Sequence, residues 1–517
     1  MKKLLIILPI LTGILSCTDL DEEVYTEIVN DNFFKTEKQA LAAAGPAYSN
    51  LRAYPNPENA WGLNTLTTDE MLIPKRGIHW DNDGIYRRFH KHEWVPTEFI
   101  IGNAWRFIYV NVNNCNRLIY QLGQVEDKSE ALISVMKELR GLRAFFYYHA
   151  IDLFGNVPLY DRYDVPEEYA PPTITRQEIF DYLERELIEA IPDLNDAVDM
   201  TTYGRFHRWA AYTLQAKLYL NAEVYTGQAM WDECIAACDS IINSGNYLLE
   251  EDYFDTFIIN NEGSDENIFV IPFDNTQPVD WGGDGMSVRM FQLHFWTLHF
   301  VGNQAFDMTQ PPWNGMCAVP SFIRSYDTTD YRYNQWLIGL QFSTTGDTLR
   351  CNVEKNGEPL IHTIDITSLE AAYENEGARL AKYDYTGAEN WTLSNDFVVF
   401  RYADVLLMKA EALMRKNGGV ATQQAVDLVN QVRARAFPGD ASKLYTTSTL
   451  TLDAMLAERG WEFAGEGYRR PDLIRFGKFN DTLDFRPVPA AATYNIFPIP
   501  QEQINANPNL TQNPGYD

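Results

Sequence analysis

Basic residues are scarce in this chain of 517 residues. Lysine and arginine together number 42, whereas aspartate and glutamate number 71, which gives a formal net charge of −29 at pH 7. Because such a surface repels phosphate groups, we do not expect general binding to nucleic acid or to bare anionic lipid. The acidic residues are spread along the chain, which is typical of a solvated surface and not of an acidic tail.

Cysteine is also rare, with six residues in the chain. The five that follow Cys17 are an odd number, so in an oxidising compartment at least one stays unpaired. Cys234 and Cys238 are one helical turn apart, and we interpret them as small buried apolar residues. No cluster of cysteine and histidine has the spacing of a zinc site. The sequence also lacks a Gly-x-Ser-x-Gly, a His-Glu-x-x-His, a Walker loop and a dinucleotide fingerprint, so we expect neither a catalytic site nor a catalytic metal or cofactor.

No apolar run in the sequence reaches the roughly 20 residues of a membrane-spanning helix. The run from Leu4 to Leu15 follows Met1-Lys2-Lys3 and ends at Ser16-Cys17, which resembles a bacterial lipoprotein signal. This interpretation predicts that residues 1–16 are removed and that Cys17 carries acyl chains, which together anchor a protein stably. The alternative is an ordinary secretory peptide with an incidental cysteine. The acidic residues after Cys17 resemble the surface-export signal of Bacteroidetes lipoproteins.

Helical periodicity covers much of the chain. Apolar residues make up 45% of it, which is enough for a large core. Apolar stripes at helical spacing, with threonine or serine at several starts, predict most of the helices. The loose helix-turn-helix spacing resembles tetratricopeptide repeats. The predicted helices are Thr36–Ala53, Phe99–Leu122, Ser129–Leu153, Ile174–Leu187 after a cap at Thr173, Arg208–Tyr225, Met230–Ser244, Phe397–Lys416, Thr422–Ala436 and Leu450–Glu466.

Two segments, residues 55–97 and about 260–395, lack a sustained helical period. They are rich in glycine, asparagine, aspartate, proline and tryptophan, so we expect long loops with short strands. Asn267–Phe273 is a predicted strand. Long loops inside a compact protein are usually functional, and aromatic loops on a helical scaffold are typical of a binding protein.

Several motifs appear in order along the chain and together resemble the SusD/RagB family of outer-membrane nutrient-binding lipoproteins. They are the lipoprotein start, residues 138–148 (ELRGLRAFFYY) with 153–159 (LFGNVPL), residues 400–412 (FRYADVLLMKAEA), residues 458–463 (ERGWEF) with 467–475 (GYRRPDLIR), and residues 497–508 (FPIPQEQINANP).

The resemblance implies a mostly α-helical SusD-like fold with several tetratricopeptide-like helix pairs and long irregular loops with short strands. It implies one domain over residues 17–517, with a helical repeat part at about 30–250 and a loop-rich and C-terminal part at about 251–517. It also implies a lipid-anchored protein on the cell surface of the outer membrane. Such a protein would capture oligosaccharides and deliver them to a TonB-dependent, SusC-like transporter.

Most of the family motifs are expected to be structural. Arg140 and Arg143 lie one turn apart on a helix, where long arginine stems cover apolar surface and the guanidinium groups pair with carboxylates or carbonyls. Further inter-helix ion pairs are predicted for Arg401, Asp404, Glu411, Glu458 and Arg469.

The first candidate ligand segment is residues 67–84. A sugar site needs flat aromatic side chains for the C–H faces and planar polar side chains for the hydroxyl groups. By its match to the family, this segment lies at the binding face and supplies four candidate residues. These are Asp69, Arg76, Trp80 and Asn82. Trp80 as a loop-core anchor and Asp69 as a helix cap remain the alternatives.

The second candidate segment contains Trp281, Trp313 and Asn314. The sequence Pro312-Trp313-Asn314-Gly315 holds an indole on a turn beside an amide. A structural calcium ion near Asp81 or Asp83 stays open, because the spacing matches no defined calcium loop. Three alternatives to glycan delivery also stay open: a peptide-binding lipoprotein, a structural or adhesive surface protein and, least favoured, a glycoside hydrolase.

Overall fold

The computed structural model describes residues 37–166, 168–276, 291–389 and 391–516 of the chain. Cys17, the signal segment and Trp281 lie outside these residues. Helices dominate the architecture, as predicted, and the strands are short. The α-helices are α2 (Glu37–Ser49), α3 (Ala60–Leu66), α4 (Ile85–Lys91), α5 (Phe99–Gly123), α6 (Glu130–Phe154), α7 (Arg176–Ala190), α8 (Arg208–Leu220), α9 (Ala222–Thr226), α10 (Trp231–Ile242), α11 (Leu293–Thr297), α12 (Pro320–Arg324), α13 (Tyr402–Lys416), α14 (Gln423–Ala436), α15 (Leu452–Glu462), α16 (Arg469–Arg475) and α17 (Gln501–Ala506).

The strands of the described residues pair two by two and antiparallel. The longest pair, β4 (Asn267–Ile271) with β10 (Phe397–Arg401), is fully buried and joins the loop-rich part to the C-terminal helices. The other pairs are β1 (Met71–Leu72) with β5 (Cys317–Ala318), β2 (Val157–Pro158) with β3 (Thr173–Ile174), β6 (Trp336–Leu337) with β9 (Arg379–Leu380), and β7 (Gly339–Leu340) with β8 (Ile361–His362).

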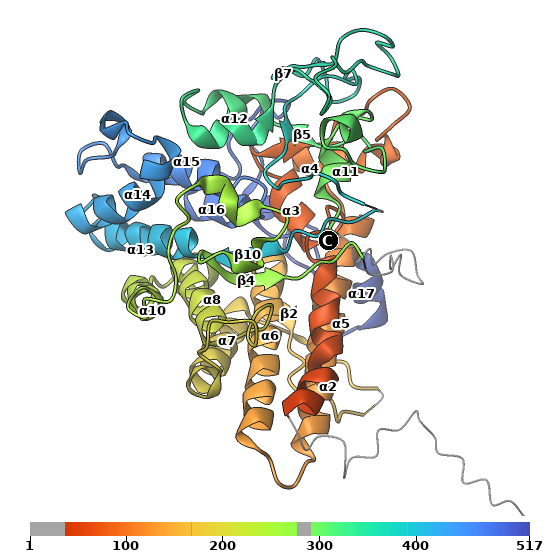
Figure 1. Cartoon of the computed structure of the whole chain (residues 1–517). Helices are drawn as coiled ribbons and strands as arrows, with labels where there is room; N and C mark the ends of the chain where they lie inside the picture. Colours follow the sequence, from red (N-terminus) through yellow and green to blue (C-terminus); the bar gives the residue numbers. More distant parts are fainter. Residues whose placement is uncertain (1–36, 167, 277–290, 390, 517) are drawn as a thin grey trace, which may run out of the picture.

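The long helices pack against one another, mostly in the order of the sequence. Helix α5 packs on α6 and α6 on α7, while α8 packs on α10, α10 on α13 and α13 on α14. In Figure 1 the helices α5 to α8 fill the lower part of the molecule, and α13 to α16 lie at its left. The largest apolar cluster contains residues from Ala44 to Ile499, so the helical and loop-rich parts share a core. A second cluster lies among α13, α14 and α15.

The helix prediction is confirmed for most elements, and its errors lie mainly at the helix boundaries. Helix α7 begins after Thr175, whose side chain forms a capping box with Glu178, and the predicted cap Thr173 lies instead in β3. Residues Phe397–Arg401, predicted as the start of a helix, form the strand β10, because the run Phe-Val-Val-Phe is β-branched and aromatic and pairs with β4. The predicted helix Arg208–Tyr225 is broken at Asn221, and that of Leu450–Glu466 ends at Glu462.

The predicted ion pairs are confirmed, and two of the predicted residues, Arg401 and Glu458, belong to a buried network that we call the arginine–glutamate network. Arg401 is fully buried and contacts Glu266, Glu462 and Glu466 at 2.7–2.8 Å. Arg435 contacts Glu462 at 2.6 Å and also Glu266. Arg332 links Asp330, Glu458 and Glu462. Because each charge is removed from water, the network is stable only when every member has its partners. Nearby, Asp404 pairs with Arg459 and Glu411 with Arg475.

Cys234 and Cys238 are buried, as predicted, and the five described cysteines are all free thiols. In the described part of the chain, no helix is both long enough and apolar enough to cross a membrane.

Replacing Arg401 tests the arginine–glutamate network. Arg401→Ala leaves Glu266, Glu462 and Glu466 without their shared counter-charge in a dry environment, so we expect a loss of about 3–5 kcal/mol in the free energy of unfolding, measured by urea denaturation. The control is Lys416→Ala, which breaks the exposed pair with Asp232 and should cost less than about 1 kcal/mol. Equal effects of the two variants would contradict a structural role for the network.

Candidate ligand-binding site

The two predicted ligand segments lie side by side. Strands β1 and β5 pair Met71 with Ala318 and Leu72 with Cys317. The pairing continues where the Val319 N–H donates to the Glu70 carbonyl at 3.0 Å. The main-chain N–H groups of residues 313–315 donate hydrogen bonds to carbonyl groups of α11 and of Leu298, the residue that follows it. For example, the Trp313 N–H donates to the Phe295 carbonyl at 2.8 Å. Helix α4, which follows the Trp80 segment, lies close to α11 and β5 in the upper part of the molecule in Figure 1.

Tryptophan side chains from three loops converge at this place. Trp80, Trp313 and Trp391 are each partly exposed, and we call them the tryptophan platform. The indole N–H of Trp80 donates to the Trp313 carbonyl at 2.8 Å, and the rings of Trp313 and Trp391 are 6.3 Å apart.

The platform rests on two buried aromatic side chains. Trp296 contacts the rings of Trp80 and Trp313 at centroid distances of 5.1 and 5.8 Å. Phe295 contacts Trp313 and Trp391 at 5.3 and 5.2 Å. Because the platform rings are backed by buried rings, they are held in fixed orientations while part of their surface faces solvent. Preformed aromatic surfaces of this kind suit the C–H faces of sugar rings.

The backbone around Trp80 is strained in a way that fixes its ring. Trp80 has a φ of +61°, and Asn82, Asp83 and Gly84 also have positive φ. Asparagine, aspartate and glycine tolerate this region, but a bulky residue there costs about 1–3 kcal/mol. Gly315 makes room for the ring, because a Cβ at this position would lie 2.5 Å from Cζ2 of Trp80. Strain that is held by such close packing is typical of a functional site.

Two buried arginines lie under the platform and tie its loops together. Arg76 donates to the Glu376 carbonyl at 2.9 Å and to the Cys317 sulfur at 3.2 Å. Arg379 donates to Asn314 Oδ1 at 2.8 Å and to the Glu374 carbonyl at 3.0 Å. Burial lowers the pKa of both guanidinium groups, and that of Arg379 falls to about 9 because Arg76 is also close. The two arginines therefore cross-link the segments that carry Trp80, Trp313 and Glu374.

The predicted polar residues take different places around the platform. Arg76 and Asn314 are buried beneath it, and the Asn314 amide also donates to the Glu374 carbonyl at 2.9 Å. Asn82 is exposed on the strained turn after Trp80. Asp69 lies apart from the platform and forms a bidentate ion pair with Arg469, at 2.7 Å for both contacts. Contact of these four residues, and of Trp281, with a glycan stays a prediction.

Trp391 was missed by the sequence analysis. It stands in the polar segment Gly387-Ala388-Glu389-Asn390-Trp391, so the criterion that selected Trp313, a tryptophan in a loop rich in turn residues, would also have selected it. Its position depends on contacts with residues far away in the sequence, which the local sequence does not reveal. One of them is the hydrogen bond that the Leu393 N–H donates to the Phe291 carbonyl at 3.1 Å.

One group of potential metal ligands stands out among the described residues, and two of its members already form hydrogen bonds within the protein. His299, Cys351 and Glu374 are buried and close together. His299 Nδ1 accepts from the Val301 N–H at 3.2 Å, which leaves the ring proton on Nε2, 3.2 Å from Glu374. Burial alone would raise the pKa of Glu374, but hydrogen bonds from His299 and from main-chain N–H groups outweigh this and lower it to about 2.

The Asp81 carboxylate, near which a calcium ion was considered, forms ion pairs with Lys75 and Arg87 at 3.3 and 2.8 Å. A calcium site there stays a prediction.

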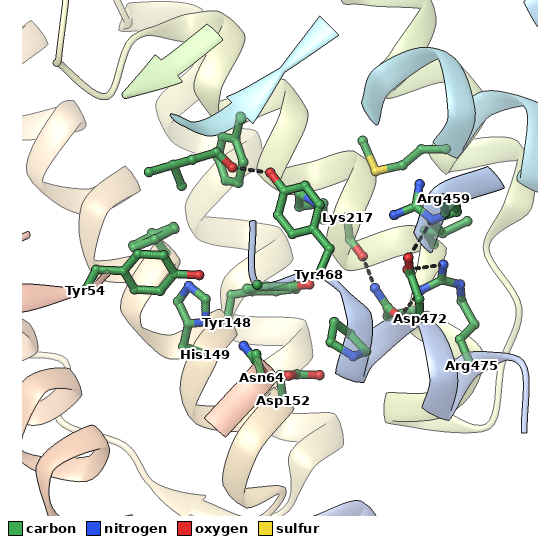
Figure 2. Close-up of a pocket in the computed structure, with 18 residues that line it drawn as sticks. Tyr54, Asn64, Tyr148, His149, Asp152, Lys217, Arg459, Tyr468, Asp472 and Arg475 are labelled. Carbon is green, nitrogen blue, oxygen red and sulfur yellow. Dashed lines mark hydrogen bonds and ion pairs between the residues drawn. The ribbon is translucent and has the colours of Figure 1, made fainter. Parts of the chain in front are cut away.

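A small cavity elsewhere in the molecule has too little room for a sugar (Figure 2). Its volume is about 30 Å³, which is the space of one water molecule. Polar groups from α3, α6, α8 and the C-terminal part of the chain line it, among them Asn64, His149, Lys217 and Asp472. Both ring nitrogens of His149 and Oδ1 of Asn64 have no hydrogen-bond partner among the described residues, so the cavity suits a buried water.

Two family models match this chain. The model described as the SusD family matches residues 318–516, and the one described as starch-binding associating with outer membrane matches residues 25–220. These two matches, near the two ends of the chain, confirm the resemblance to the SusD/RagB family that the sequence motifs predicted.

Related proteins match this chain over most of its length, and solved structures share its fold. Starch-binding protein SusD of Bacteroides thetaiotaomicron is 26% identical, over 88% of this chain and 85% of its own. SusD-like protein P2 of Formosa agariphila is 26% identical over 98% of both chains. The structure of surface glycan-binding protein A from B. thetaiotaomicron in complex with laminarihexaose superposes with a TM-score of 0.73 at 23% identity, covering 92% of this chain and 99% of that one. This likeness confirms the SusD-like helical fold.

Glu70, beside Asp69, gives the stability of the fold a testable pH dependence. Its carboxyl group is fully buried and accepts the Gly465 N–H, while Oε2 has no partner among the described residues. Burial raises its pKa from 4.5 to about 8. Since the folded pKa is raised, this group's stabilisation is complete below pH 4.5 and is lost as pH rises towards 8, by roughly 1.4 kcal/mol per pH unit.

Glu70→Gln should therefore remove a decline in stability between pH 4.5 and 8. The measurement is a series of urea denaturation curves across this range, with the exposed Glu358→Gln as the control. Parallel pH profiles for Glu70→Gln and the wild type would show that Glu70 is ionised in the folded protein.

Proposed function

We propose that this chain is a glycan-binding protein of the outer-membrane surface that captures oligosaccharides without cleaving them. The observation that carries the proposal is the tryptophan platform, in which three partly exposed indoles from separate loops are fixed on a buried aromatic base. Support comes from the relatives, which are named for starch binding or carry laminarihexaose. Stacking on several rings at once favours an oligosaccharide over a single sugar.

The carboxylates near the platform support binding over hydrolysis. A glycoside hydrolase needs one carboxylic acid that is protonated near neutral pH beside a second carboxylate. Glu374 has a pKa of about 2 and accepts N–H groups from His299 and the main chain, while Glu376 accepts hydrogen bonds from Thr367 and the Tyr373 N–H. These bonds hold both groups as structural acceptors beneath the platform.

The finer parts of the proposal concern the anchor and the partner. Cys17 would carry the acyl chains that hold the protein at the outer membrane, and a SusC-like, TonB-dependent transporter would receive the captured glycan. The family model's description as associating with the outer membrane supports this location. An interface that covers a transporter would exceed the roughly 1,600 Å² of a standard complex.

Removing single platform rings should weaken glycan binding. A stacked ring contributes only part of its 150–250 Å², so Trp80→Ala, Trp313→Ala and Trp391→Ala should each cost on the order of 1–3 kcal/mol, or about 5- to 150-fold in affinity. Retardation in gels containing starch, laminarin or other polysaccharides finds the ligand, and calorimetry with its oligosaccharides gives the affinity.

The matched control for these variants is Trp209→Ala. Trp209 is also partly exposed, but it lies on α8, where its N–H donates to the Asp196 carbonyl. Trp209→Ala should change the affinity for the glycan little. Thermal melts of all the variants show whether a loss of affinity is accompanied by a loss of stability. Unchanged affinity in all three platform variants would place the ligand elsewhere, and release of reducing ends by the wild type would show an enzyme.

Replacing Cys17 tests the anchor. Cys17→Ala should release the protein from the membrane fraction, and the wild-type N-terminus should carry the mass of acyl chains. The SusC-like partner should co-purify with the wild type from outer membranes solubilised in mild detergent. Membrane fractionation that is the same for both proteins, with no lipid mass, would contradict lipidation at this residue.

A further inference from the structure

A second cavity combines an aromatic wall with planar polar groups. It has a volume of about 350 Å³ and lies between α12, α15, α16 and residues 478–486. This volume is at the lower end of the range for ligand pockets. In Figure 1, α12 and α15 lie to the left of β5, whereas α11, which carries the base of the platform, lies to its right. The cavity shares no lining residue with the tryptophan platform.

Trp461 supplies the aromatic wall of this cavity. Its indole N–H already donates to Ser325 Oγ at 2.9 Å, so what remains for a ligand is the ring surface, which is partly exposed. Phe322, Leu456 and Leu473 continue the apolar wall. Three other cavities in the described part of the chain, including that of Figure 2, contain no tryptophan in their walls.

The Asp69–Arg469 ion pair supplies the polar part of the cavity wall. Both carboxylate oxygens of Asp69 accept from the guanidinium group of Arg469, and the Arg469 Nη1 also donates to the Leu456 carbonyl at 2.8 Å. Each oxygen keeps a further lone pair, and the Asp69 side chain is 26% exposed, so it can accept sugar hydroxyl groups in a fixed geometry. Asp69 was predicted as a glycan ligand, and this cavity is where its carboxylate is accessible.

The charges around the cavity favour a neutral ligand. Burial lowers the pKa of Arg486 to about 10, and the ammonium group of Lys478 lies 3.9 Å from a carboxylate oxygen of Asp453. The cationic and anionic side chains of the wall are equal in number, so neither a uronic acid nor an amino sugar is preferred. They are Arg469, Arg486 and Lys478 against Asp69, Asp453 and Asp481.

We propose that the Trp461 cavity is a second saccharide site, which takes a neutral hexose unit of the glycan. The ring of Trp461 covers the C–H face, while Asp69 and the rim residues Lys478 and Thr482 bind hydroxyl groups. This inference rests on the proposed glycan-binding function and extends it. Two sites on one protein, separate from each other, strengthen retention on a polysaccharide by raising the effective concentration of the second contact.

Fluorine NMR of the full chain labelled with 5-fluorotryptophan tests both sites in one sample. The 12 tryptophans give separate probes, and single Trp→Phe variants assign the signals of Trp80, Trp313 and Trp461. The ligands are maltohexaose and laminarihexaose, titrated in turn. With at least one of them, the Trp461 signal should shift along its own saturation curve, different from that of Trp80 and Trp313.

A blocking variant shows where the Trp461 shift originates. Thr482 is exposed at the cavity rim, so Thr482→Phe should fill the mouth without removing a core side chain and should abolish the Trp461 shift while the Trp80 shift stays. Gln431→Phe, on the exposed face of α14, is the matched control and should change neither shift.

Two results would overturn the second site. One is a Trp461 signal that stays in place with both hexasaccharides, and the other is a Trp461 shift that persists in Thr482→Phe. In either case the Trp80 and Trp313 signals show separately whether the proposed glycan-binding function stands.

Discussion

The arginine–glutamate network is the constraint on which the rest of the structure depends. Arg401, at the end of β10, is surrounded by Glu266, Glu462 and Glu466, which come from two parts of the chain that are distant from β10 in sequence. Charges that are fully removed from water are tolerated only in this joint arrangement, because any segment that moved away would leave its partners unpaired. The network therefore fixes β4, β10, α14 and α15 relative to one another.

The ligand loops are tied to this network by a short series of contacts. Glu466 also holds Lys382, which follows β9, and Gly465 donates its N–H to Glu70. Glu70 lies directly before β1, which leads to Trp80, and β1 pairs with β5, which follows Trp313. Both tryptophan segments are therefore connected to the network through Glu70 and β1. Arg76 and Arg379 then cross-link the far ends of these segments. A preorganised site of this kind loses little conformational entropy when a glycan binds.

Sequence patterns predicted the parts of the structure that depend on local physics. The helical stripes depend on neighbouring residues, and the arginine motifs carry charges that need partners wherever they are buried. The strand β10 was mistaken for helix because its pairing with β4 is a contact across more than a hundred residues. The separation of Asp69 from Trp80 was not predictable either, since it results from the ion pair of Asp69 with Arg469 near the other end of the chain. Trp391 joined the platform for the same kind of reason.

The most direct test of the account is a crystal structure of the protein soaked with an oligosaccharide from a polysaccharide that it binds in solution. The account predicts sugar rings stacked on Trp80, Trp313 and Trp391, with these indoles in the orientations that Trp296 and Phe295 impose on them. An oligosaccharide bound only away from the tryptophan platform, with the platform indoles uncovered, would contradict it.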